Sequence, residues 1–184
     1  MCLILTSWQS HPEYPLVVLA NRDEFYERAT DPMGWWGDHP NILAGRDRAD
    51  VKGQSGTWMG ISKSGRFAAI TNVRAPSEKN PDAQTRGEIT AKFLKTSDSP
   101  EIFIDTHAHT FNRYNGFNLL ATDLSYKNPE LVWLSNRVLM GKNLRPRKVM
   151  NPQRLNPGIY GLSNGMLDTP WPKVQHRVGA FAQL

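Results

Sequence analysis

The 184-residue chain contains a single cysteine, and that cysteine is residue 2. One cysteine excludes an internal disulfide and any zinc site built from several cysteines. No apolar run approaches the ~20 residues needed to span a bilayer. The first residues also lack the basic region of a secretory signal. These absences agree with a reducing compartment, so the expected location is the cytoplasm, without a transmembrane segment.

Several motifs for binding phosphates, metals and nucleic acids are missing as well. The sequence has no GxxxxGK or GxGxxG loop and no GxSxG nucleophile elbow. His107 and His109 lie two apart on an expected helix and point away from each other, so no metal site is predicted. The formal net charge is +5, but Lys and Arg are scattered. Their densest group is Arg145, Arg147, Lys148 and Arg154. Because prolines interrupt it, we expect a solvated loop and no nucleic-acid partner.

The remaining pattern alternates between β-prone runs and three helical segments. Strands are expected over 2–8, 16–20, 41–45, 57–62, 66–72, 116–123, 130–136 and 158–164. The turn "SKSG" joins 57–62 to 66–72 as a hairpin. Helices are expected over 85–96, over 99–111 and from Pro172 onward. This order predicts one α+β domain over 1–184 with antiparallel sheets, not a parallel βαβ fold.

Local signals refine the first two helices. Thr85 and Glu88 match a capping box, and Ser99 followed by a proline matches an N-cap. The second helix is expected to turn Ile102, Phe103 and Thr106 toward the core.

Cys2 is a candidate nucleophile because of its position. Removal of Met1 would leave a thiol and a free α-amine on one residue. An α-amine with a pKa of about 7.7–8.0 can accept the proton of a thiol with a pKa of about 8.5. The base is then part of the nucleophile itself. The alternative is a small buried residue in the first strand, with Met1 retained.

The segment "ANRDEF" places polar side chains at the end of the second expected strand. If that strand pairs with the first, Arg22 and Asp23 come near Cys2. Arg22 can lower the pKa of the thiol and bind an acyl oxygen, while Asp23 can hold the α-ammonium or orient a water. Alternation puts Asn21 and Asp23 on one face and Arg22 and Glu24 on the other, so all four line one site only if the strand has ended. The alternative is a surface turn held by an Arg–carboxylate pair.

Two asparagines and several tryptophans complete the set of candidates. Asn72 and Asn164 each end an apolar strand, where a side-chain amide can donate to an oxyanion or cap a turn. The tryptophans that can line an apolar pocket or form core are Trp35, Trp36, Trp58, Trp133 and Trp171. Trp58, Asn21 and Glu24 are the candidates for substrate binding.

Together these stretches resemble one family. "MCLIL", "ANRDE", "GTWMGIS", "AAITNVR", "RGEI", "YNGFNLL", "YGLSN" and "LDTPWPKV" are similar to motifs of the NRDE proteins, the relatives of transport and Golgi organisation protein 2. That family resembles the N-terminal nucleophile hydrolases of the choloylglycine hydrolase and penicillin V acylase branch. The resemblance implies a four-layer αββα sandwich and Cys2 as nucleophile after loss of Met1. It also implies that Asn72 is an oxyanion-hole amide and Asn164 a second asparagine on the substrate side.

The resemblance leaves two assignments open around Cys2. One places Asn21 at an arginine position of the acylases and Glu24 at an aspartate position, and the other uses Arg22 and Asp23 directly. Members of the family also continue well beyond this point, with later strands and a further active-site arginine. We therefore expect the chain to be incomplete at its C-terminal end, to lack part of its second sheet and to leave a strand edge exposed.

The implied activity is acyl transfer or amide hydrolysis. Cys2 would act on an amide or thioester of a small or lipid-like molecule, without a required cofactor. Relatives of this family have been linked to Golgi organisation, lipid and acyl-CoA metabolism and haem movement. The alternative is therefore a non-catalytic protein that carries haem or a lipid-like ligand in the same pocket. A third reading is a trafficking partner whose site no longer functions.

Overall fold

The computed structural model describes residues 2–48, 56–74, 79–140, 143–146 and 150–183. Its strands are β1 (Leu3–Trp8), β2 (Leu16–Asn21), β3 (Thr30–Trp35), β4 (Ile42–Asp47), β5 (Met59–Ser62), β6 (Arg66–Asn72), β7 (Phe117–Asp123), β8 (Leu131–Ser135), β9 (Arg137–Met140), β10 (Asn143–Pro146), β11 (Gln153–Leu155) and β12 (Gly158–Leu162). Its helices are α1 (Gly87–Lys95), α2 (Pro100–His107), the 3₁₀ helix η2 (Ala108–Arg113) and α3 (Pro172–Phe181). None of the described helices is long and apolar enough to cross a membrane.

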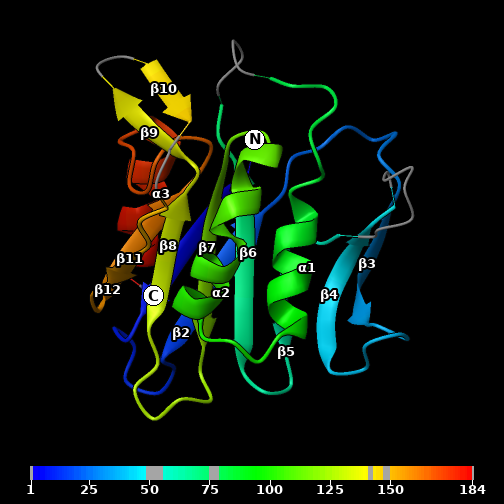
Figure 1. The fold of residues 1–184 in the computed structure, drawn as a ribbon. Helices are drawn as coiled ribbons and strands as arrows, with labels where there is room; N and C mark the ends of the chain where they lie inside the picture. Colours follow the sequence, from blue (N-terminus) through cyan, green and yellow to red (C-terminus); the bar gives the residue numbers. More distant parts are fainter. Residues whose placement is uncertain (1, 49–55, 75–78, 141–142, 147–149, 184) are drawn as a thin grey trace.

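The strands form two stacked antiparallel sheets and a small hairpin. The large sheet has seven strands in the order β11-β8-β7-β6-β5-β4-β3, and the small sheet has three in the order β12-β1-β2. In Figure 1 the green helices α1 and α2 cover the front of the large sheet, and the blue N-terminal strands lie behind it. β9 and β10 form the separate hairpin.

Four layers follow from the way these elements pack. One apolar cluster joins α1 and α2 to the large sheet, with Phe93 and Leu119 buried at its centre. A second cluster joins the two sheets, with Trp8 on β1 and Leu120 on β7 among its members. On the other side of the small sheet, α3 packs on β12 and β1. The chain is therefore an α+β protein with the layer order helix, sheet, sheet, helix.

The predicted antiparallel α+β fold is confirmed. The expected hairpin corresponds to β5 and β6, and the expected strand pair 2–8 and 16–20 to β1 and β2. Three further elements were not predicted, namely β3, the β9–β10 hairpin and β11. Arg145 and Arg154 therefore lie in short strands instead of the expected loop, while Arg147 and Lys148 fall outside the described residues.

Two details of the helices differ from the prediction. In α2 the buried residues include Phe103 and Ile104, while Ile102 is 56% exposed and Thr106 is also exposed. In α1 the capping box is absent. The N-cap is Arg86 without a side-chain bond, and Glu88 forms an ion pair with Lys92 instead. The Ser99 cap on α2 is confirmed, because its hydroxyl accepts from the backbone N–H of Ile102.

The contact between α3 and β12 depends on Gly161. A Cβ at this position would lie 2.5 Å from Val174 Cγ1 and 2.7 Å from Val178 Cγ2. Because valine is stiff at χ1, we expect Gly161→Ala to lower the free energy of unfolding by about 1–3 kcal/mol, measured by urea denaturation. Gly179→Ala in α3, on the other side of this contact, is the control, since nothing lies within 4 Å of its Cβ position. An equal loss in both variants would contradict this packing.

Candidate functional site

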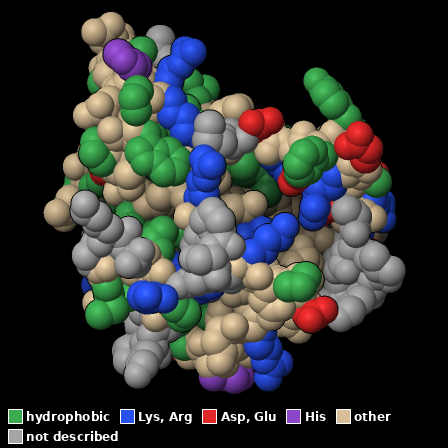
Figure 2. Space-filling view, turned by 90° about the horizontal axis from the view of Figure 1, so that it is seen from above, with side chains coloured by type: hydrophobic (Ala, Val, Ile, Leu, Met, Phe, Trp, Pro, Cys, Tyr) green, Lys and Arg blue, Asp and Glu red, His purple; other side chains and the backbone are tan. Residues whose placement is uncertain are grey.

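A cleft of about 900 Å³ opens at the end of the molecule where β1 begins and where β2 and β6 end. Figure 2 looks onto this end, and Lys and Arg side chains gather around the hollow. The sequence-predicted candidates that line the cleft are Cys2, Arg22, Asp23, Glu24, Trp58 and Asn72. Asn21 and Asn164 are not among its described lining residues. The fold thus brings together side chains from the ends of three strands.

Cys2 lies directly before β1 and is half-buried, with a free thiol. Its carbonyl oxygen accepts a hydrogen bond from Ser163 Oγ at 2.7 Å and another from Lys173 Nζ at 3.3 Å. Both donors come from the C-terminal part of the described chain, next to β12 and in α3. These bonds hold the backbone of Cys2 in place at the cleft wall.

Arg22, Asp23 and Glu24 reach the cleft because β2 ends at Asn21. The strict alternation of a strand no longer applies after that residue. Asn21 itself stays in the sheet, paired with Leu3. Glu24 lies 3.4 Å from Arg22 Nη2 and 3.8 Å from Arg28 Nε, so two guanidinium groups share its charge.

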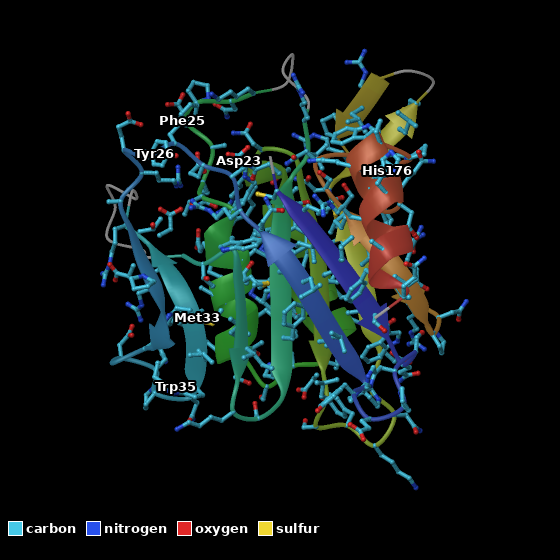
Figure 3. The ribbon with its side chains drawn as sticks, turned by 180° about the vertical axis from the view of Figure 1, so that it is seen from behind. Asp23, Phe25, Tyr26, Met33, Trp35 and His176 are labelled. Carbon is cyan, nitrogen blue, oxygen red and sulfur yellow. The ribbon has the colours of Figure 1, made fainter. Side chains whose placement is uncertain are left out.

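The charges around Cys2 are coupled to one another. The N-terminal ammonium group holds the pKa of Asp23 below its ordinary value, and Lys173 adds a smaller effect in the same direction. Burial lowers the pKa of Lys173, while the charges of Cys2 and Asp23 act against that shift. Figure 3 shows Asp23 at this end of the molecule.

The two asparagines take different positions. Asn72 ends β6, is exposed and lines the cleft, and no partner of its side-chain amide is found among the described residues. Asn164 is buried, and its Nδ2 donates to the backbone oxygen of Asn72 at 2.9 Å. This bond leaves Asn164 Oδ1 buried without a described partner. Asn164 therefore holds the backbone of Asn72 in place, while the Asn72 amide is available to a ligand.

A buried polar network lies behind these residues. Thr71 Oγ1 donates to the carbonyl of Ser163 at 2.7 Å, and Asn118 Nδ2 donates to Thr71 Oγ1 at 3.1 Å and to the carbonyl of Gly165 at 2.8 Å. All members come from β6, β7 and the turn after β12. Buried hydrogen bonds of this kind fix relative positions, because breaking one leaves a desolvated group unpaired. The network thus ties the Asn72 strand to the turn that holds Cys2.

Sequence reasoning missed two cationic residues near Cys2. Lys173 bonds to the Cys2 carbonyl from α3, and Arg86 lines the cleft at the start of α1. In the sequence, Arg86 belongs to the stretch "RGEI" and Lys173 to the stretch "LDTPWPKV". Nothing in those stretches indicates a role for the charge, because each contact depends on residues far away in the sequence.

The tryptophans and histidines separate into different environments. Trp36 and Trp133 are buried in the two apolar clusters, and Trp35 is 54% exposed on the edge strand β3. Trp58 is half-buried between the core and the cleft. Across the described ranges no group of three or more His, Cys, Asp or Glu could hold a metal ion. His107 bonds through Nδ1 to the carbonyl of Phe103.

The fold and the cleft define an α+β sandwich protein in which Cys2, directly before β1, lies in a charged cleft at the end of its sheets. A family model described as Transport and Golgi organisation 2 matches residues 1–184. The chain belongs to the transport and Golgi organisation 2 family.

Similar proteins come from mammals and from insects. The chain is 38% identical over 182 residues to the Mus musculus protein named Transport and Golgi organization 2 homolog, and 37% identical over 178 residues to the Homo sapiens one. It is 28% identical over 186 residues to Transport and Golgi organization protein 2 of Drosophila melanogaster. These matches cover 95–96% of this chain but only 60–62% of each relative. The chain thus spans about 60% of the length of the relatives it matches.

Proposed function

We propose that this chain is an acyl-transfer protein of the N-terminal nucleophile type, in which Cys2 acts on an amide or thioester of a small or lipid-like molecule. One observation carries the proposal. Cys2, Arg22, Asp23 and Asn72 come from the ends of three strands and line one cleft. A free thiol, a cationic environment and an available amide donor are the parts that acyl transfer needs.

The proposed reaction has two halves. Once Met1 is removed, the α-amine of Cys2 takes the thiol proton, and Sγ attacks the carbonyl carbon of the substrate. The amide of Asn72 donates to the oxyanion that forms on the carbonyl oxygen. The leaving amine or thiol departs with the proton, and a thioester on Cys2 remains. Water then releases the acid by attack on that thioester, and Cys2 regains its proton.

The surrounding residues have supporting roles in this proposal. Arg22 and Asp23, which line the cleft directly, set the charge at the α-amine and the thiol, while Asn21 stays in the sheet. This arrangement favours the assignment that uses Arg22 and Asp23 over the one that uses Asn21. Glu24 and Trp58 are proposed to contact the substrate, because both line the same cleft. Asn164 is proposed to act through Asn72.

The test of this function has two readouts on the full chain. Intact-mass spectrometry of the purified protein is expected to show that Cys2 is the first residue. A thioester probe is expected to acylate the wild type, and to add no acyl mass to Cys2→Ala because no other cysteine is present. Turnover of the acyl-enzyme is followed by release of the acid. Retained Met1, or equal acyl mass on Cys2→Ala, would rule out this mechanism.

A second candidate function is transport of haem or a lipid-like molecule without catalysis. The volume of the cleft favours it, because about 900 Å³ lies within the range of about 300–1,000 Å³ found for ligand sites. Trp58, Met59 and Ile70 supply an apolar part of the lining. This function predicts a Soret shift when haem is titrated into the wild type and into Cys2→Ser. No shift at micromolar haem would count against it.

A further inference from the structure

Arg86 is a cleft residue whose charge is not used by the mechanism above. It is the residue before α1, and its side chain lines the same cleft as Cys2. Its Nη1 donates to the carbonyl oxygen of Gly116 at 3.1 Å. No carboxylate lies within ion-pair distance of its guanidinium in the part of the chain that the structure describes. The positive charge of Arg86 is thus only partly compensated.

The charges nearby do not supply the missing partner. Arg28 and Arg137 act on Arg86 with the same sign, and Glu24 and Cys2 act with the opposite sign. Glu24 already lies between Arg22 and Arg28. Arg28 is in turn bonded to Asp47 at 2.6 Å. Glu24, the carboxylate that acts on Arg86, therefore already pairs with Arg22 and Arg28. The guanidinium of Arg86 has no carboxylate partner of its own among the described residues.

A half-buried arginine without a carboxylate partner destabilises the folded protein, because no ion pair offsets the free energy of desolvating its charge. Burial and the charge of Arg28 both lower the pKa of Arg86, so the surroundings disfavour its charged form. A bound ligand with one negative charge would offset this desolvation free energy. Carboxylates match the planar fork of arginine in a bidentate geometry. Because carboxylates such as Asp23, Asp47 and Glu88 line the same cleft, a monoanion suits it better than a dianion such as phosphate.

We infer that Arg86 binds a carboxylate of the ligand, and that the substrate of Cys2 is an acyl compound carrying a carboxylate close to its reacting carbonyl. This inference rests on the proposed function for the role of Cys2, and it adds the class of the substrate. Arg86 is thereby assigned as a specificity residue in the same cleft. Cys2 and Arg86 line the same cleft, and the charge of Cys2 acts on Arg86 with the opposite sign.

The test compares two alkylating reagents of nearly equal size and different charge. Iodoacetate and iodoacetamide both react when the Cys2 thiolate attacks the CH₂ carbon, so that an S–C bond forms and iodide leaves. Cys2 is the only cysteine, and intact mass therefore reports its reaction alone. The ratio of the two rates cancels any change in the pKa of the thiol. We expect Arg86→Gln to lower the ratio of the iodoacetate rate to the iodoacetamide rate about fivefold. A loss of this size lies between the effect of removing an exposed ion pair and that of removing a charge-assisted hydrogen bond.

Two control variants separate binding from structure. Arg154→Gln removes the same charge from an exposed pair with Glu101, and neither residue is among the described lining of this cleft, so the ratio is expected to stay unchanged. Arg86→Lys keeps the charge without the fork and is expected to give an intermediate ratio. Thermal unfolding and circular dichroism check that each variant folds. If Arg86→Gln slows both reagents equally, the residue has only a structural role and the inference is overturned.

The remaining outcomes also decide the inference. Absence of reaction with either reagent in the folded chain would place the thiol out of reach of the cleft and overturn it. Protection of Cys2 by inorganic phosphate but not by an equal concentration of acetate would overturn the carboxylate assignment. Alkylation does not require a free α-amine or turnover. If the protein retains Met1 or fails to release acid, the proposed function is refuted. If the ratio of the two rates still depends on Arg86 in that protein, the anion site at Arg86 is retained.

Discussion

Replacing Asn72 with alanine is expected to slow acylation of Cys2 about 100-fold, the loss typical of removing one oxyanion donor. Asn72 lines the cleft and is exposed, and no hydrogen-bond partner of its side-chain amide is found among the described residues. Its removal should leave the fold intact because the side chain is exposed. The measurement is the rate of acyl mass gain on Cys2 with a thioester probe, together with the free energy of unfolding.

Asn164→Ala is the informative comparison for this prediction. It removes the bond from Asn164 Nδ2 to the backbone of Asn72 from a buried position. We expect it to lower the free energy of unfolding by about 1–2 kcal/mol and to slow acylation as well. Asn72→Ala should change the rate alone. An unchanged acylation rate in Asn72→Ala would exclude Asn72 as the oxyanion donor.

Replacing Asp123 with asparagine is expected to lower the free energy of unfolding by about 3 kcal/mol, as for the loss of one partner of a buried ion pair. Asp123 Oδ2 lies 2.5 Å from Arg66 Nη1, and both side chains are buried. Arg66 also donates to the carbonyls of Phe93 and Asp98, so it joins the sheet to the end of α1. The variant leaves this guanidinium charged and without a carboxylate. Urea denaturation followed by circular dichroism measures the change.

An exposed ion pair provides the control for Asp123→Asn. Arg154 bonds to Glu101 at 2.6 Å on the surface, and Arg154→Gln is expected to cost no more than about 1 kcal/mol. Replacing both buried partners, as in Arg66→Met with Asp123→Leu, should recover part of the loss because no unpaired charge remains. A cost for Asp123→Asn equal to that for Arg154→Gln would contradict the buried pair as a source of stability.

The parts of the fold that were predicted from sequence are those with a strong local pattern. β1, β6 and β7 are largely apolar runs bounded by turns, and they are buried almost throughout. β2 and β5 were predicted from the same kind of run, although Leu19 on β2 and Ile61 on β5 are exposed. β3 has no such pattern, because it is an edge strand with Pro32 and a bulge between Asp31 and Gly34. Prolines and irregular pairing are tolerated at an edge, where one side of the strand has no partner. Its position depends on β4 and not on its own sequence.

The helical errors have similar causes. In α2, Phe103 stands between two isoleucines, so the sequence fits two helical phases, and packing against the sheet selects the one that buries Ile104. In α1, Glu88 could reach back to cap the helix. It bonds instead to Lys92 and lies 3.4 Å from the hydroxyl of Tyr114. Tertiary partners thus decided between local alternatives that the sequence left open.

The candidate site divides in the same way. Residues 22–24, which follow β2, and Asn72, the last residue of β6, were selected as candidates because polar groups at strand ends can meet a cleft. The contacts of Arg86 and Lys173 depend on how α1 and α3 dock on the sheets. No spacing in the sequence encodes that docking, so their roles become visible only in three dimensions.

The bonds that hold Cys2 have a consequence for synthesis. The two donors to its carbonyl lie 161 and 171 positions later in the chain, and β1 pairs with β12 along one edge. At about 5–20 residues per second, a ribosome needs roughly ten to thirty seconds to add that length. During this interval the N-terminus cannot yet occupy its final position. An aminopeptidase acting on Met1 would therefore meet an extended chain, and the bonds that hold Cys2 at the cleft form only after α3 has been made.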